Sequence, residues 1–268
     1  MEGASWRVVA GALVLVVAGA SVALAIDEKS EPAPTTTVTE TVSQPRAERA
    51  PRPEPPPPPR PGPAALELPK RGNPIVWVRA GEQARIHGSP GGEVVETVGP
   101  RTEFGSQSVF AVLERRGQWA GVPNPFTGNE ELGWLKLDPR ALNASYTLRE
   151  IVVDLSEFRA ELLIDDEVVR TFTVAIGAPE TTTPTGRFAV TDTFRGDLNP
   201  AYGCCAVALT AEQPNLPSGW LGGNRIAIHG TSGPLGEPIS AGCVRAADRD
   251  VNALVNEVPP GAPVLVRQ

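Results

Sequence analysis

The stretch RIAIHGTSGPLGEPISAGCVR, residues 225–245, contains one histidine and one cysteine between short apolar runs and glycines. A short apolar run opens it and ends at His229, one of two histidines in the chain. Cys243, one of three cysteines, follows fourteen positions later. Gly230 and Gly242 stand beside these two residues and permit close approach of backbone or substrate. A cysteine nucleophile needs a base at hydrogen-bond distance. His229 and Cys243 are therefore a candidate catalytic pair, the alternative being a buried histidine and a small hydrophobic thiol.

The cysteine count adds to this hypothesis. Three cysteines cannot all pair within one chain, so at least one is free or pairs outside it. Cys243 precedes Arg245 and an expected helix, two features that favour the thiolate. Cys204 and Cys205 are adjacent, and a disulfide between neighbours closes a strained ring. We therefore expect both to be small hydrophobic residues that alternate across a strand in GCCAVAL.

Residues 147–268 around this stretch are predicted to form a mainly β domain. Strands are expected near 150–155, 158–164 and 168–176, with a turn at 184–186 before another strand. One helix is expected near the C-terminal end, in AADRDVNALVNEV. Its apolar residues recur at helical spacing: Val251, Leu254, Val255 and Val258.

Residues 67–142 are predicted to form a separate small β domain. Short apolar runs at 75–78, 84–86, 94–98, 108–113, 118–122 and 132–137 are separated by turn signals. Trp119 and Trp134 are expected in its core, with a ligand groove as the alternative. His87 is interpreted as a turn histidine.

The N-terminal quarter predicts export. Residues 8–26 are nineteen positions without a charge, long enough to span a bilayer. Ala23-Leu24-Ala25 fits a signal-peptidase site, so residues 1–26 are a cleaved signal peptide or a membrane anchor. Residues 27–66 include twelve prolines and are predicted to be a disordered linker. We expect the rest of the chain in the cell envelope, with membrane association through residues 8–26 as one possibility.

Charge and ligand chemistry exclude other classes. A net charge of −7 argues against nucleic acid as a partner, because phosphate binding needs a basic surface. Two histidines in different predicted domains and no C-x-x-C motif provide no metal-ligand set. We expect neither a metal nor a cofactor.

The ordered set TPTGRF, YG, IAIHGT and ISAGCVR resembles the L,D-transpeptidase catalytic domain family, over about residues 148–267. The preceding domain resembles, more loosely, the bacterial SH3-like domains found beside wall enzymes, and the export type resembles actinobacterial members. The resemblance implies a mainly β fold: a small SH3-like barrel followed by an L,D-transpeptidase-type β-sandwich with one helix on its C-terminal side.

The resemblance also implies roles for residues. Cys243 would attack a peptidoglycan stem peptide, and His229 would act as general base. The N–H groups of Gly242 and Cys243 would bind the oxyanion, a backbone carbonyl near Gly230 would hold the histidine, and Ser240 would fix the loop. Further candidates contact substrate: Arg245, Tyr202 and Thr231.

One position departs from the family pattern, since Ala241 stands where the family has a histidine before Gly-Cys. His229, not that residue, matches the family's base, so catalysis should survive. Three functions stay open: an L,D-transpeptidase that joins diamino acids of donor and acceptor stems, an L,D-carboxypeptidase of the same fold, and a non-catalytic wall-binding protein.

Overall fold

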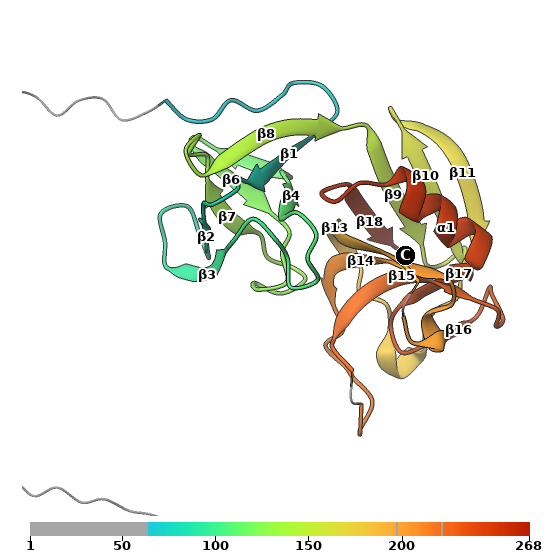
Figure 1. Ribbon diagram of the computed structural model, residues 1–268. Coiled ribbons are helices and arrows are strands. Elements are labelled where there is room, and N and C mark those ends of the chain that lie inside the picture. The colour runs from blue at the N-terminus through green and yellow to red at the C-terminus, as the bar shows by residue number, and fades with distance from the viewer. Residues whose placement is uncertain (1–63, 197, 221) are drawn as a thin grey trace, which may run out of the picture. The chain divides into compact units, whose positions relative to one another are not determined.

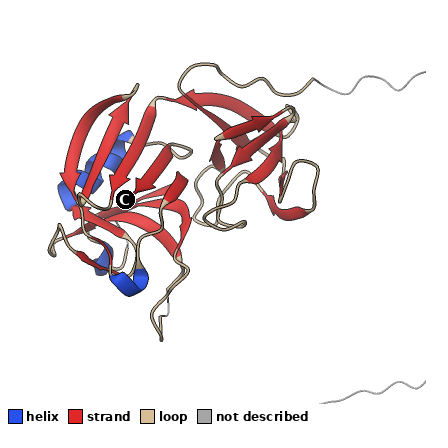
Figure 2. Ribbon diagram, turned by 180° about the vertical axis from the view of Figure 1, so that it is seen from behind, coloured by secondary structure: helices blue, strands red, loops and turns tan. Residues whose placement is uncertain are grey.

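The computed structural model describes residues 64–268 except positions 197 and 221. The described residues belong to one compact unit, and they are mainly β with one α-helix (Figures 1 and 2). The apolar segment 8–26 and the linker up to residue 63 lie outside the described residues. Within the described range, no helix has the length and apolar character to cross a membrane.

The N-terminal β region (residues 64–147) consists of two sheets. One has the strand order β4-β1-β8 and the other β3-β2-β7-β6-β5. The strands are β1 (Asn73–Val78), β2 (Ala84–His87), β3 (Val94–Val98), β4 (Val109–Ala111), β5 (Glu114–Arg116), β6 (Trp119–Val122), β7 (Gly133–Lys136) and β8 (Leu142–Thr147). An all-β region was expected here; its finer assignment as an SH3-like barrel stays a prediction.

Two features of this region differ from the expectations, namely the extent of its last strand and the burial of one tryptophan. Strand β8 crosses the expected end of the domain and pairs with β1 along six residues. Its sequence LNASYT has little apolar character, so its pairing partner, and not its composition, makes it a strand. Trp134 is buried under the Arg116 guanidinium, whereas Trp119 is half-buried and contacts the edge of the His87 ring.

The C-terminal β region (residues 148–268) is built on eight strands in the order β11-β10-β9-β18-β13-β14-β15-β17 (Figure 1). These are β9 (Arg149–Asp154), β10 (Arg159–Ile164), β11 (Glu167–Thr173), β13 (Gly186–Arg195), β14 (Cys205–Glu212), β15 (Arg225–Thr231), β17 (Val244–Ala247) and β18 (Pro263–Arg267). Strands β12 (Ile176–Gly177) and β16 (Pro238–Ser240) form a short parallel pair beside them.

Strand β13 joins the two halves of this arrangement. Residues 186–189 pair with β18, and residues 190–195 pair with β14 through a ladder whose register shifts between Val190 and Asp192. Such an irregularity bends a strand and lets it serve two sheet segments. Ile151 and Leu162 from one half share a single core cluster with Val207 and Ile228 from the other.

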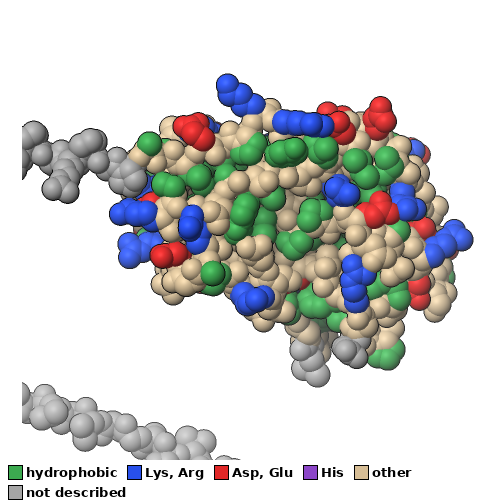
Figure 3. Space-filling model, turned by 45° about the horizontal axis from the view of Figure 1, so that its top comes forward, with side chains coloured by type: hydrophobic (Ala, Val, Ile, Leu, Met, Phe, Trp, Pro, Cys, Tyr) green, Lys and Arg blue, Asp and Glu red, His purple; other side chains and the backbone are tan. Residues whose placement is uncertain are grey.

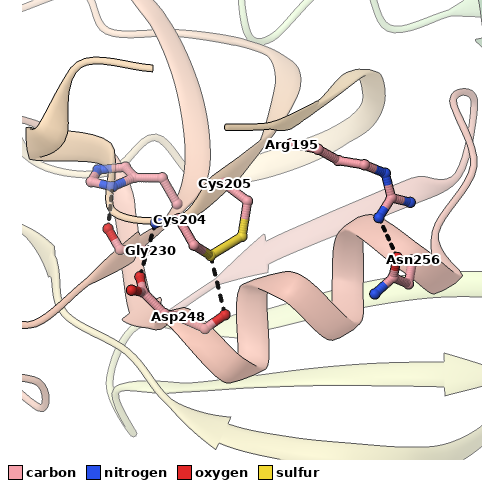
Figure 4. The surroundings of a disulfide bond; sticks show 7 residues. Arg195, Cys204, Cys205, Gly230, Asp248 and Asn256 are labelled. Carbon is pink, nitrogen blue, oxygen red and sulfur yellow. Dashed lines mark hydrogen bonds between the residues drawn. A yellow bond between two sulfur atoms is a disulfide. The ribbon is translucent and has the colours of Figure 1, made fainter. Parts of the chain in front are cut away.

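The predicted amphipathic helix is confirmed as α1 (Asp248–Glu257). Val251, Leu254 and Val255 are buried against β14 and β15, as the helical spacing of apolar residues requires. Arg195 of β13 binds the C-terminal end of the helix. Its guanidinium donates to the Asn256 side chain (Figure 4) and to the Val255 carbonyl at 2.9 Å. The helix therefore packs from the core side against strands that carry the candidate site.

The surface around this core is mixed in character. On the face in Figure 3, hydrophobic side chains lie between separated arginine or lysine and acidic side chains. Exposed apolar residues include Val168 and Val169 on the edge strand β11. The charged side chains on this face therefore do not form one stripe of a single sign that would attract a charged partner over a long range.

The two adjacent cysteines do not behave as the sequence predicts, because Cys204 and Cys205 form a disulfide (Figure 4). The expected alternation fails because Cys204 lies outside the strand: β14 begins at Cys205, directly after a turn at Gly203 with φ +62°. Cys204 N–H donates to Asp248 Oδ1 at 3.1 Å, and its sulfur contacts the Asp248 carbonyl at 3.3 Å. The disulfide is thereby attached to the first residue of α1.

Candidate active site

Two neighbouring parallel strands bring the candidate nucleophile and base together. In the β15–β17 ladder, Ile228 pairs with Val244 and His229 with Arg245. One more step in this register places Cys243 opposite Ala227. Alternate residues of a strand share a face, and opposite residues of paired strands point to the same side. Cys243 and Arg245 therefore flank His229 on one face of the sheet, and all three line one cavity of about 310 Å³.

The other walls of this cavity come from two connections. Tyr202 lies on a short 3-10 turn before β14 and contacts the His229 ring edge-to-face at 4.9 Å between centroids. The connection between β14 and β15 adds Gln213, Leu216 and Trp220. The remaining described lining residues are Asn199, Ala201, Gly222, Gly223, Asn224, Arg225, Ile226 and Ala241. The cavity thus combines aromatic walls with a few polar groups, as ligand sites generally do.

His229 is held in the tautomer that a general base needs. Its side chain is 4% exposed, and Nδ1 lies 2.9 Å from the Gly230 carbonyl oxygen. A carbonyl only accepts, so Nδ1 carries the hydrogen and Nε2 keeps its lone pair. Burial lowers the pKa of His229, and nearby Arg245 lowers it further, against the opposing effect of the Gly230 carbonyl. The ring is therefore neutral near pH 7 and can accept a proton.

Cys243 is the free cysteine of the described chain. Burial raises the pKa of its thiol, although the Ala227 backbone and Arg245 partly oppose this. The expectation of a thiolate at a helix N-terminus is wrong, because β17 separates Cys243 from α1. A neutral thiol must give up its proton before its sulfur can act as a strong nucleophile, and a neutral imidazole can accept that proton.

The loop of residues 240–243 is fixed at every carbonyl. Ser240 Oγ donates to the Cys243 carbonyl at 2.6 Å and accepts the Gly242 N–H at 3.0 Å. Ser240 thus makes the contacts that a loop-fixing role requires. Of the two N–H groups expected to bind the oxyanion, that of Gly242 has an acceptor in Ser240 Oγ, whereas the described residues provide none for that of Cys243.

Three further residues hold this loop, and the sequence assigned none of them a role. Thr181 Oγ1 donates to the Ser240 carbonyl at 2.9 Å, and Thr183 Oγ1 donates to the Gly242 carbonyl at 2.8 Å. Gln213 Nε2 lies 3.4 Å from the Ala241 carbonyl and donates to the carbonyls of residues 181 and 182 at 3.0 and 3.1 Å. Thr183 belongs to the TPTGRF motif, which was the available signal; Gln213 had none.

Gly242 must be glycine for two reasons. Its φ is +116°, a conformation that side chains rarely adopt. A Cβ at this position would also overlap Gln213 Nε2. The hydrogen bonds of the Gln213 side chain and the turn at Gly242 therefore depend on each other. Cys243 is the next residue after this turn.

The expected substrate-binding residues lie in different surroundings. Arg245 borders the cavity and a second hollow that contains Glu180 and Ile239; its Nε is buried without an acceptor among the described residues. Tyr202 lines the cavity, where burial raises its pKa and the nearby Cys243 adds to this. Thr231 ends β15, accepts a hydrogen bond from the Gly233 N–H, and is absent from the described cavity lining.

Within residues 64–268, outside the two positions without a description, no group of three histidine, cysteine or acidic side chains is arranged to hold an ion. The chemistry available to the site is that of a thiol, an imidazole, a guanidinium and oriented backbone groups.

The comparisons with known proteins agree with the motifs for part of the chain. Residues 148–266 match the family model YkuD, described as the L,D-transpeptidase catalytic domain. Two curated relatives carry L,D-transpeptidase YkuD in their names. The Bacillus subtilis protein is 28% identical over 120 residues, 44% of this chain and 65% of the relative. The Bacillus licheniformis protein is 31% identical over 118 residues, 43% of this chain and 64% of the relative. This chain therefore spans less than two thirds of either relative.

Solved structures give a weaker likeness. L,D-transpeptidase 3 from Mycobacterium tuberculosis is 18% identical, with a TM-score of 0.39, over 51% of this chain and 74% of that one. An L,D-transpeptidase from Mycobacterium smegmatis is 16% identical, with a TM-score of 0.37, over 51% of this chain and 73% of that one.

Proposed function

Because residues 148–266 match the L,D-transpeptidase catalytic domain, we propose that this protein is a peptidoglycan L,D-transpeptidase of the cell envelope. The observation that carries the proposal is the placement of His229, Cys243 and Arg245 on one sheet face, around one cavity. A nucleophile, an oriented base and a cation within one cavity are the parts that acyl transfer from an anionic peptide needs.

The protonation states support a stepwise acyl transfer. His229 Nε2 removes the Cys243 thiol proton while the sulfur attacks the carbonyl between the diamino acid and the terminal D-alanine of a tetrapeptide stem. The carbon–nitrogen bond then breaks, His229 returns the proton to the leaving D-alanine amine, and a thioester remains. The side-chain amine of a second stem attacks the thioester, which restores the thiol and creates a cross-link between two diamino acids.

Two groups are suited to the charges in this reaction. The Cys243 N–H has no acceptor among the described residues, and we assign it to the developing oxyanion. The Arg245 guanidinium has no acidic partner among the described salt bridges, and we assign it to a carboxylate of the stem peptide. Tyr202 forms a wall of the acyl cavity.

The test is the intact mass of the full chain and its products after incubation with a disaccharide-tetrapeptide, beside a Cys243→Ala control. We expect a cross-linked dimer and released D-alanine from the cysteine form alone. Tripeptide without dimer would replace the transpeptidase by an L,D-carboxypeptidase, in which water is the acceptor. No mass change in either form would refute both enzymes and favour a wall-binding protein.

A further inference from the structure

The connection between β14 and β15 forms one wall of the candidate active site, and the backbone ladder at its base is interrupted. Gln213, Leu216, Trp220 and Asn224 of this connection line the cavity. The β14–β15 ladder is irregular between Ala208 and Glu212, and pairing resumes only at the Glu212–Arg225 pair. One further bond, from the Gln213 N–H to the Asn224 carbonyl at 2.7 Å, closes the base. A strand end with an interrupted ladder opens easily unless other groups hold it.

The N-terminal β region binds this base on its β14 side through Asn129. The Asn129 side chain donates from Nδ2 to the Glu212 carbonyl at 2.7 Å. It accepts the Glu212 N–H on Oδ1 at 2.8 Å. Both backbone groups of Glu212 are therefore bonded by one amide side chain, as they would be by a neighbouring strand.

The same region binds the β15 side of the base through Glu103. Its Oε1 lies 2.7 Å from Arg225 Nη2, and the Arg225 side chain is 17% exposed. The guanidinium also reaches the Thr191 hydroxyl at 3.3 Å and the Leu209 carbonyl at 3.4 Å through Nη1. Arg225 borders the same cavity as Cys243. A charge-assisted bond to a largely buried arginine is among the stronger polar contacts.

We infer that the N-terminal β region is a positioning element of the active site, which acts by bracing the Glu212–Arg225 pair from both strands. Asn129 and Glu103 come from connections 26 residues apart in sequence and converge on one paired position of the ladder. The consequence for substrate binding rests on the proposed function, whereas the consequence for local order does not. Asn129 and Glu103 are positioning residues, since neither borders the cavity that contains Cys243.

The first measurement is hydrogen exchange by mass spectrometry on the full chain, for Asn129→Ala, Glu103→Gln and the double variant. Glu130→Gln is the matched control, because Glu130 is an exposed acid next to Asn129 with no described side-chain partner. We expect the amides of Glu212 and Gln213 to exchange about 5- to 30-fold faster in Asn129→Ala, since the variant removes two hydrogen bonds that each contribute about fivefold. The control should match the wild type.

The second measurement is steady-state turnover of the same variants. We expect KM for the donor stem to rise about 5- to 50-fold with kcat within about threefold, because the braced connection lines the cavity and not the reacting atoms. Unchanged exchange in the double variant, or an equal rise in Glu130→Gln, would overturn the inference. If the wild type has no turnover while exchange still rises in Asn129→Ala, the structural role of the N-terminal β region is supported and the proposed function is refuted. Both single variants alter partly exposed groups, so each is expected to fold.

Discussion

Replacing Thr183 by valine should separate the loop tether from the chemistry it supports. The two side chains have nearly the same shape, but valine lacks the hydroxyl. Thr183 is 4% exposed. Its Oγ1 accepts the Gly177 N–H at 2.9 Å and donates to the Gly242 carbonyl at 2.8 Å. Thr183→Val therefore removes two hydrogen bonds and leaves two buried backbone groups without partners.

The magnitude follows from those two groups. A buried donor or acceptor left unsatisfied costs about 1 to 3 kcal/mol, and the extra apolar contact of valine offsets a small part. We expect the free energy of unfolding to fall by about 2 to 4 kcal/mol. For a domain of this size, that lowers Tm by roughly 4 to 16 °C. Because the Gly242 carbonyl is released next to Cys243, kcat should fall about 10- to 100-fold.

The assays are urea unfolding and the rate of acyl-enzyme formation by mass spectrometry, with Thr171→Val as control. Thr171 is exposed on the edge strand β11, so its hydroxyl can be replaced by water. The control should stay within about 0.5 kcal/mol of the wild type. Equal stability and equal acylation of Thr183→Val and Thr171→Val would refute the idea that the threonine holds the loop.

Three further predictions use simpler measurements. The rate of Cys243 alkylation should keep rising with pH beyond the ordinary thiol pKa of about 8.5, because burial raises the pKa of this thiol. The unreactive thiol then persists until the solution pH passes its pKa in the folded protein. A plateau of the rate near pH 6 would indicate a preformed thiolate instead. Without reductant, alkylation of the denatured chain should add one group, whereas reduction should expose Cys204 and Cys205 and add three; three groups without reductant would contradict the disulfide. Gly230→Ala should lower the Tm, because its Cβ would overlap the carboxylate at the start of α1, whereas Gly223→Ala has open space around it; equal melting of the two variants would oppose this.

The sequence predicted the periodic parts of the fold, and it identified His229 and Cys243 as the candidate reactive pair. The helix α1 was predictable because four apolar residues at helical spacing need one buried face, and Val251 and Leu254 occupy it. His229 and Cys243 were identifiable as chemistry-bearing residues beside glycines. Their position in one cavity depends on the β15–β17 register, which no local pattern specifies.

Long-range contacts explain what the sequence did not predict. Strand β8 has a polar sequence and depends on β1, about seventy residues earlier. Gln213 lies in a connection without motif character and is functional only because residues 181, 182 and 241 fold next to it. The Cys204–Cys205 disulfide was missed because an unbroken strand was assumed where the turn at Gly203 displaces Cys204 from β14.

The parallel pairing of β15 with β17 has a consequence for how such a site can evolve and be engineered. The ladder sets where His229 and Cys243 meet, so the number of residues between them is not what fixes their distance. The crossover between β15 and β17 begins with three exposed residues, Ser232, Gly233 and Pro234. They precede Gly236, whose N–H donates to the Val174 carbonyl before the chain enters β16. Insertions there should lengthen the motif and leave the catalytic geometry intact, because closing a longer surface loop costs little free energy. The crossover is thus a place that should tolerate changes in length, and a place to graft a reporter peptide beside the candidate active site.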